Sequence, residues 1–118
     1  MNFVFRILII IFISIFAASI TKSAEYNSVC AVFKNNQLIE RNSCNAKTLS
    51  NTNRDESEPY IREYKWKSGG KTITSNIEEF FQINGHDGET VFTKDGYDLC
   101  VKNLSSGNTF CVGERVRL

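Results

Sequence analysis

The residues after position 60 follow the two-residue period of β-strands, and no stretch there sustains a helical apolar period. Short runs of β-forming residues alternate with turn signals about every eight to twelve residues, as in all-β sandwiches and barrels. In the run 60–67, Tyr60, Arg62, Tyr64 and Trp66 share one face, and the opposite face is mainly charged. We expect this aromatic face to form half of a small core; the alternative is a ligand platform.

Turn signals at Ser68-Gly69-Gly70, Asn84-Gly85 and Asp95-Gly96 divide the rest of the chain. The segment 76–81 has apolar spacing that fits a helical turn, and the polar segment 45–58 is expected to form a long surface loop. The pattern predicts one all-β domain, an antiparallel meander of about seven or eight short strands in a barrel or a sandwich. The strands expected after 60–67 cover 71–75, 79–83, 89–93, 97–102 and 109–112, with the last reaching 116 at most.

The first segment has a different pattern. Arg6 precedes fourteen uncharged residues, 7–20, and small polar residues follow at 21–24. This order is typical of a secretory signal peptide, and the apolar run is shorter than the roughly 20 residues that span a bilayer. We expect a signal peptide at 1–23, cleaved after Ser23 or after Ala24, and a single domain at 24–118 that does not insert into the membrane. An uncleaved N-terminal anchor is the alternative.

Four cysteines, Cys30, Cys44, Cys100 and Cys111, follow this segment, and an even count in a small exported chain indicates two disulfides. If Asn103 faces Asn108 across the four-residue turn 104–107, Cys100 lies directly opposite Cys111. The pair 30–44 then follows by elimination and encloses a hairpin around Asn35-Asn36. The cysteine spacing does not match common zinc sites, and the chain has no C-x-x-C motif.

The amino-acid composition excludes one class of function. The 118 residues include 14 Lys+Arg and 13 Asp+Glu, a formal charge of +1, so a strongly basic arm for nucleic acid is excluded. The isoleucine-rich leader and the Asn/Lys-rich chain favour a bacterial source. We therefore expect a secreted or periplasmic protein with no nucleic-acid partner, no cofactor and no bound metal.

Candidate catalytic groups are few. His86 and Asp87, in a glycine-flanked turn, could form an acid/base pair or half of a metal site, but one histidine supplies too few metal ligands, and a solvated hairpin tip explains both residues. Asp95 and Asp98 could form a carboxylate pair, although Asp95 also starts an Asp-Gly turn. The run Gly69-Gly70-Lys71-Thr72 lacks the first glycine of a phosphate-binding loop. We expect no enzymatic activity.

The turn Ser68-Gly69-Gly70 in a small exported β domain with cysteine staples resembles, in outline, bacterial periplasmic inhibitors of C-type lysozyme. The resemblance covers this one turn, and Thr72 occupies the place where those proteins have tyrosine. It implies a small barrel that inserts a serine-bearing loop into the lysozyme cleft.

The leading hypothesis is a non-enzymatic exported binding module that engages a macromolecular or glycan partner through its loops. A lysozyme-type hydrolase inhibitor and a small hydrolase centred on His86 are the alternatives. The loop 45–58 is a further candidate surface. The predicted partner-binding residues are Ser68, Gly69, Gly70, Lys71, His86 and Asp87.

Overall fold

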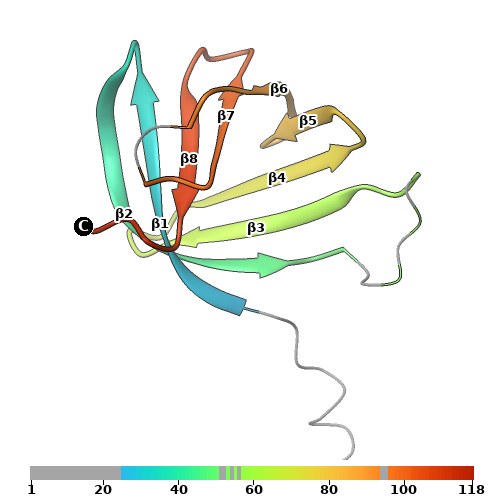
Figure 1. The fold of residues 1–118 in the computed structure, drawn as a ribbon, viewed down its shortest axis with the longest axis horizontal. Helices are drawn as coiled ribbons and strands as arrows, with labels where there is room; N and C mark the ends of the chain where they lie inside the picture. Colours follow the sequence, from blue (N-terminus) through green and yellow to red (C-terminus); the bar gives the residue numbers. More distant parts are fainter. Residues whose placement is uncertain (1–24, 51–52, 54, 56, 94–95) are drawn as a thin grey trace, which may run out of the picture.

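The computed structural model describes residues 25–50, 53, 55, 57–93 and 96–118, and these form a closed barrel of eight antiparallel strands (Figure 1). Consecutive strands pair with each other, and β1 pairs with β8, so closure leaves the sheet without an exposed edge. The predicted all-β meander is confirmed, and a barrel is the form it takes. The strands are β1 (Glu25–Lys34), β2 (Gln37–Thr48), β3 (Tyr60–Trp66), β4 (Lys71–Ile77), β5 (Phe80–Ile83), β6 (His86–Thr90), β7 (Leu99–Asn103) and β8 (Thr109–Gly113).

Strands β1 and β2 form the hairpin predicted around Asn35-Asn36. Asn35 and Asn36 form their two-residue turn with positive φ angles of 51° and 63°, a conformation that asparagine tolerates. Strand β2 continues to Thr48 and pairs with β3, so the prediction of a loop over 45–58 is wrong for its first four residues. Ala46 is buried there, and one small apolar residue among polar ones is a weak signal for a strand.

Two predictions around β5 are also wrong. The segment 76–81 is not a helical turn, because Glu78, with a φ of 53°, closes a tight turn between Ile77 and Phe80, which pair across the hairpin. Strand β6 begins at His86 rather than at residue 89, because the Asn84-Gly85 turn places His86 directly opposite Ile83. The predicted signal peptide at 1–23 lies outside the described residues, as does Asp95.

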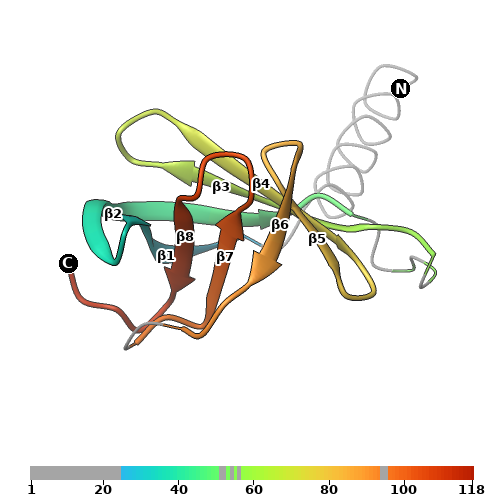
Figure 2. The ribbon, with the colours of Figure 1, turned by 90° about the horizontal axis from the view of Figure 1, so that it is seen from above.

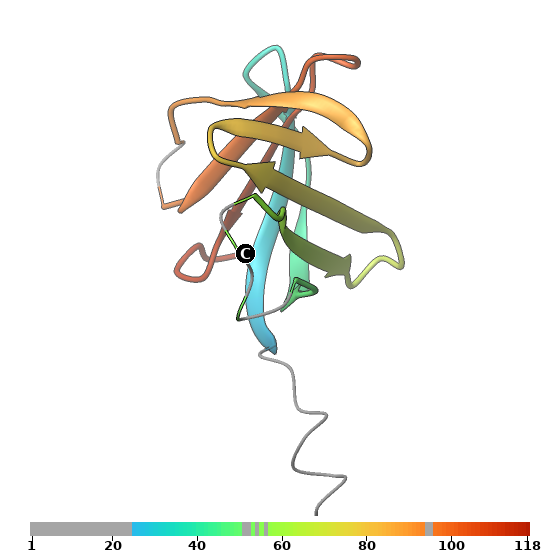
Figure 3. The same cartoon turned by 90° about the vertical axis from the view of Figure 1, so that its right-hand side faces the viewer.

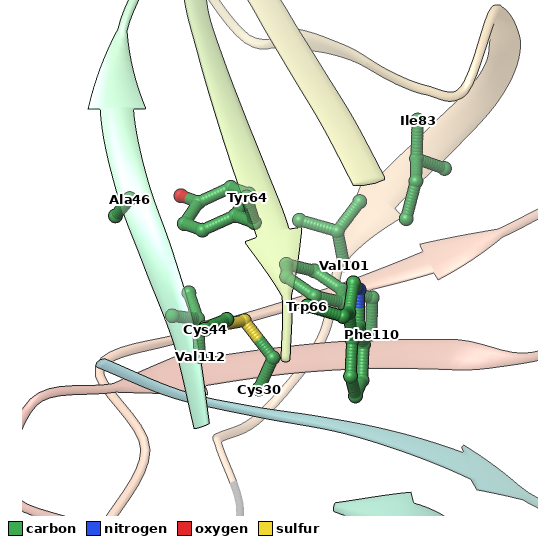
Figure 4. Close-up of a cluster of buried hydrophobic side chains, with 9 residues drawn as sticks. All are labelled: Cys30, Cys44, Ala46, Tyr64, Trp66, Ile83, Val101, Phe110 and Val112. Atoms are coloured by element: carbon green, nitrogen blue, oxygen red, sulfur yellow. A yellow bond between two sulfur atoms is a disulfide. The ribbon is translucent and has the colours of Figure 1, made fainter. Parts of the chain in front are cut away.

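The main core lies inside the barrel (Figure 4). Tyr64 and Trp66 belong to it, which confirms that part of the aromatic face as core, and Phe110 packs against both rings. The indole nitrogen of Trp66 donates a hydrogen bond of 2.9 Å to the Thr72 hydroxyl, which satisfies the one polar group of that side chain. The buried members are Cys30, Cys44, Ala46, Tyr64, Trp66, Ile83, Val101, Phe110 and Val112.

Both predicted disulfides are present. Cys100 faces Cys111 with 2.05 Å between the sulfurs, on the outer side of the barrel wall, and the Asn103 N–H donates to the Asn108 carbonyl at 2.8 Å as the hairpin register requires. The Cys30–Cys44 disulfide, with sulfurs 2.10 Å apart, lies inside the barrel. Two disulfides indicate an oxidising, extracytoplasmic environment. Among the described residues there is no helix that could cross a membrane.

A second hydrophobic cluster lies on the outside of the barrel, over β1, β7 and β8. Ala31, Cys100 and Cys111 form its floor, and Tyr97 covers them from the segment between β6 and β7. The Tyr97 ring meets Phe33 edge to face at 5.9 Å between centroids. Gly113 lets this segment approach the wall, because a Cβ there would lie 2.8 Å from the Gly96 carbonyl oxygen. We call residues 91–93 and 96–98, together with Val116, the cover.

Candidate functional site

The order of the strands sorts the loops between the two ends of the barrel. In a closed antiparallel meander, the turns after β1, β3, β5 and β7 lie at one end, which we call the turn end. Figure 2 shows the last three of these turns along one edge of the molecule. The connections after β2, β4 and β6 lie at the other end, where β1 begins and β8 ends, and which we call the terminal end. The predicted surface turns at Ser68-Gly69-Gly70 and Asn84-Gly85 therefore share an end.

The predicted serine-bearing turn is exposed between β3 and β4. The Ser68 hydroxyl donates a hydrogen bond of 3.2 Å to Glu40 Oε1, which connects this turn to β2. Gly69 has a φ of 108°, a conformation that favours glycine over other residues. The Lys71 ammonium is 4.0 Å from Glu63 Oε2 on the outer wall. These contacts fix the conformation of the turn, and its residues, Gly70 among them, are exposed to solvent.

His86 and Asp87 do not form an acid/base pair. They are consecutive residues of β6, and successive side chains of a strand point to opposite faces. His86 is paired with inward-facing Ile83, whereas Asp87 is paired with Gln82 on the outer wall. Both residues are exposed.

A shallow depression of about 220 Å³ lies at the turn end, with Val32, Ile83 and Phe110 among its lining residues. None of the six predicted partner-binding residues lines it. Two asparagine side chains of its lining make hydrogen bonds that stabilise the turns. Asn84 Oδ1 accepts from the Ile73 N–H, and Asn103 Oδ1 accepts from the Ser105 and Ser106 N–H groups. The remaining polar members are Thr72, Ser106 and Asn108.

A larger groove, of about 360 Å³, lies on the outer wall over β4, β5 and β6. Ile77 and Phe80 are paired across the β4–β5 hairpin and face outward, and the Phe80 side chain is 78% exposed. Leu104, from the β7–β8 turn, lies beside them because its N–H donates a hydrogen bond of 2.9 Å to the Asp87 carbonyl. Figure 3 shows these strands from the side on which β4 and β5 are nearest the viewer. We call Ile77, Phe80 and Leu104, with the residues around them, the outer groove.

The ionisable groups that line the outer groove are all acidic. They are Glu79 at the end of the β4–β5 turn and Asp87 on β6, and no described lysine, arginine or histidine is in the lining. Asp87 is the only predicted partner-binding residue in the groove. Sequence reasoning missed Ile77, Phe80 and Leu104, because they come from separate hairpins and only the barrel topology brings them together.

Metal binding and thiol chemistry can be assessed for the described residues. No three His, Cys, Asp or Glu side chains among them converge on a point where a metal ion could bind. All four cysteines are in disulfides, so no thiol is available. Asp98 belongs to the cover, where its Oδ2 accepts a hydrogen bond from the Glu114 N–H at 3.2 Å; its predicted partner Asp95 lies outside the described residues.

No protein-family model, curated protein or solved structure matches this chain. The function is therefore inferred from the residues of the barrel itself.

Proposed function

We propose that this chain is a non-enzymatic, exported binding module whose outer groove receives a protein segment with an apolar side chain next to lysine or arginine. The observation that carries the proposal is the 78% exposure of Phe80 inside a groove that also exposes Ile77 and Leu104. Export through a signal peptide at 1–23 is part of the proposal, and the two disulfides support it.

Apolar exposure of this kind has a physical consequence. Single exposed apolar side chains are ordinary, but a contiguous exposed patch in a hollow is typical of interaction surfaces. Burial of a phenylalanine side chain against a partner contributes about 1.5–3 kcal/mol, before the losses of translational and rotational freedom. Phe80 is placed like an anchor of this type, with Phe81 and Ile77 beside it in the groove.

The charges of the groove select the partner. Glu79 and Asp87 lie in its lining, and Glu78 is the neighbouring residue of the turn. A basic partner segment would complement these carboxylates, whereas an acidic one would be repelled. Charges at the rim mainly affect the association rate and its dependence on salt, so Asp87→Asn should weaken binding less than loss of Phe80.

The test uses a displayed library of random dodecapeptides, followed by binding of the selected synthetic peptides to the oxidised domain. We expect the selected peptides to carry an aromatic or aliphatic residue flanked by Lys or Arg. Phe80→Asp should weaken their binding at least about tenfold, since it removes the anchor and adds a charge. Phe92→Asp is the matched control, because Phe92 is 98% exposed and lies outside the outer groove.

Peptides that bind both variants equally well would refute the groove, as would selection of acidic or purely polar sequences. Sedimentation of the domain alone tests the other occupant of the groove, a second copy of this chain. A dimer that Phe80→Asp dissociates would replace the proposed partner with self-association. Tight binding of neutral oligosaccharides at the turn end, with no peptide selected, would favour a glycan partner.

One observation favours a second candidate, a lysozyme-type hydrolase inhibitor. The serine-bearing turn is exposed at one end of a small barrel, as the resemblance at Ser68-Gly69-Gly70 implies. Titration of C-type lysozyme with excess domain tests this directly. Inhibition that the double variant Ser68→Ala, Lys71→Ala abolishes would support the candidate, and full lysozyme activity at excess domain would exclude it.

A further inference from the structure

Arg62 is a cation that faces into the barrel. It lies on the inner face of β3, opposite Thr48 of β2 and Thr74 of β4. Its guanidinium carbon is 4.9 Å from the centre of the Tyr26 ring and 5.4 Å from that of Tyr64. These distances are those of cation–π contacts, which stabilise the charge only in part.

One edge of this guanidinium has no hydrogen-bond partner among the described residues. Arg62 Nε and Nη2 are buried from solvent, and neither makes a hydrogen bond to another group in the structure. The ion pairs among the described residues join Glu25 to Lys47 and Glu63 to Lys65 and Lys71, and none includes Arg62. A buried charge without a counter-ion is costly, and arginine cannot escape the cost by losing its proton.

Two buried hydroxyl groups near Arg62 also lack a hydrogen-bond partner among the described residues. Tyr64 is 0% exposed, and neither its hydroxyl nor that of buried Ser28, two residues from Tyr26 on the same face of β1, has a hydrogen-bond partner. Burial raises the pKa of Tyr64, and the Arg62 charge offsets part of that rise, which indicates that cation and hydroxyl are close. Thr74 also lowers this pKa, although its contact with Tyr64 falls short of hydrogen-bond geometry. Figure 4 shows the Tyr64 hydroxyl on the side of the ring away from Trp66 and Phe110.

We propose that Arg62 anchors an interior site for a small monocarboxylate with an apolar body, entered from the terminal end of the barrel. Nε and Nη2 form one edge of the guanidinium, and this edge binds a carboxylate through two parallel hydrogen bonds. Tyr64 and Ser28 supply further donors. One arginine balances one carboxylate, whereas a phosphate monoester would bring a second negative charge without a second cation.

The surroundings of Arg62 favour an apolar body on the ligand. Tyr26, Tyr60 and Phe81 are half-buried on the inner faces of β1, β3 and β5, and the Tyr26 ring is in contact with the guanidinium. The partial exposure of Arg62 itself is consistent with access from this end. Arg62, Tyr64 and Ser28 are not in the lining of the outer groove, which shares only Phe81 with this site.

The test titrates the oxidised domain with decanoate and with 3-phenylpropionate, and uses decanol as the uncharged probe. Trp66 is the only tryptophan and lies in the core, so its fluorescence reports binding, and the melting temperature gives a second reading. We expect the carboxylates to bind and to raise the melting temperature, and decanol to bind at least about tenfold more weakly. Acetate should have no effect at the same concentration.

Arg62→Met removes the charge and keeps an apolar side chain. We expect it to abolish the carboxylate effect and to raise the melting temperature of the ligand-free domain, because a partly buried charge without an ion-pair partner is gone. Arg62→Lys keeps the charge without the planar edge, and it should bind the carboxylates roughly tenfold more weakly than wild type does. This variant provides the test if Arg62→Met does not fold. Lys65→Met, on the outer face of the same strand, is the matched control and should bind as wild type does.

Three results would overturn the proposal. The first is that neither carboxylate binds to the wild-type domain. The second is that Arg62→Met binds the carboxylates as well as wild type does. The third is that acetate or chloride matches decanoate, which would reduce the site to one for simple anions and remove the apolar body from the claim.

Discussion

Two outward-facing apolar patches of the barrel differ in what covers them. Over β1, β7 and β8, Tyr97 of the cover lies on Cys100 and Cys111 and is only 7% exposed. Over β4, β5 and β6, Phe80 is 78% exposed, and no described part of the chain covers it. The first patch has become a second core, whereas the second remains a surface. An outward apolar patch on a small barrel is thus either closed by the chain's own loops or left for another molecule.

The largest expected effect comes from the disulfide under the cover. Replacing Cys100 and Cys111 by alanine removes a link that closes a short loop and two buried sulfurs from the floor of the cluster. We expect the free energy of unfolding to fall by about 3–4 kcal/mol, measured by urea denaturation. An unchanged denaturation midpoint would show that the covered patch contributes little to stability.

The next prediction compares one aromatic residue from each patch. Tyr97→Ala should lower the free energy of unfolding by about 3 kcal/mol, because it leaves a cavity beside Phe33. Phe80→Ala should change it by less than about 0.5 kcal/mol, because its side chain is already in water. Urea denaturation of the two variants side by side decides the matter. Equal losses would erase the distinction between a structural patch and a binding patch.

A smaller effect is expected at the close approach of the cover to the wall. Gly113→Ala would bring a Cβ to within 2.8 Å of the Gly96 carbonyl oxygen and 3.0 Å of the Tyr97 Cα, both of them backbone atoms. We expect a loss of about 2 kcal/mol and faster proteolysis within the cover. Gly70→Ala is the control, because a Cβ there meets no atom within 4 Å. Wild-type stability of Gly113→Ala would mean that the cover is loosely held.

Local chemistry explains why parts of this fold were predictable. The turn 104–107 between Asn103 and Asn108 determines the register of its hairpin, and the register pairs Cys100 with Cys111. The same reasoning failed at Glu78, because a non-glycine residue with positive φ gives no turn signal in a sequence. It placed the start of β6 too late because Gly88, which suggests a turn, lies within the strand opposite Phe81.

The candidate sites depended on contacts that sequence reasoning does not reach. Arg62 was correctly assigned to the aromatic face of β3, but whether it has an ion-pair partner among the described residues depends on all the strands around it. Phe80 and Leu104 are 24 positions apart in the numbering and become neighbours only because the β7–β8 turn is bonded to β6. Asp87 was selected for its histidine neighbour, and the structure places it in the outer groove instead.

The most direct test of the difference between the two patches is a nuclear magnetic resonance titration of the labelled domain with a basic apolar peptide from the library. We expect shifted signals at Ile77, Phe80 and Leu104, and unshifted ones at Tyr97 and in the rest of the cover. Shifts confined to the cover or to the turn 67–70 would contradict it, and so would a spectrum that the peptide leaves unchanged.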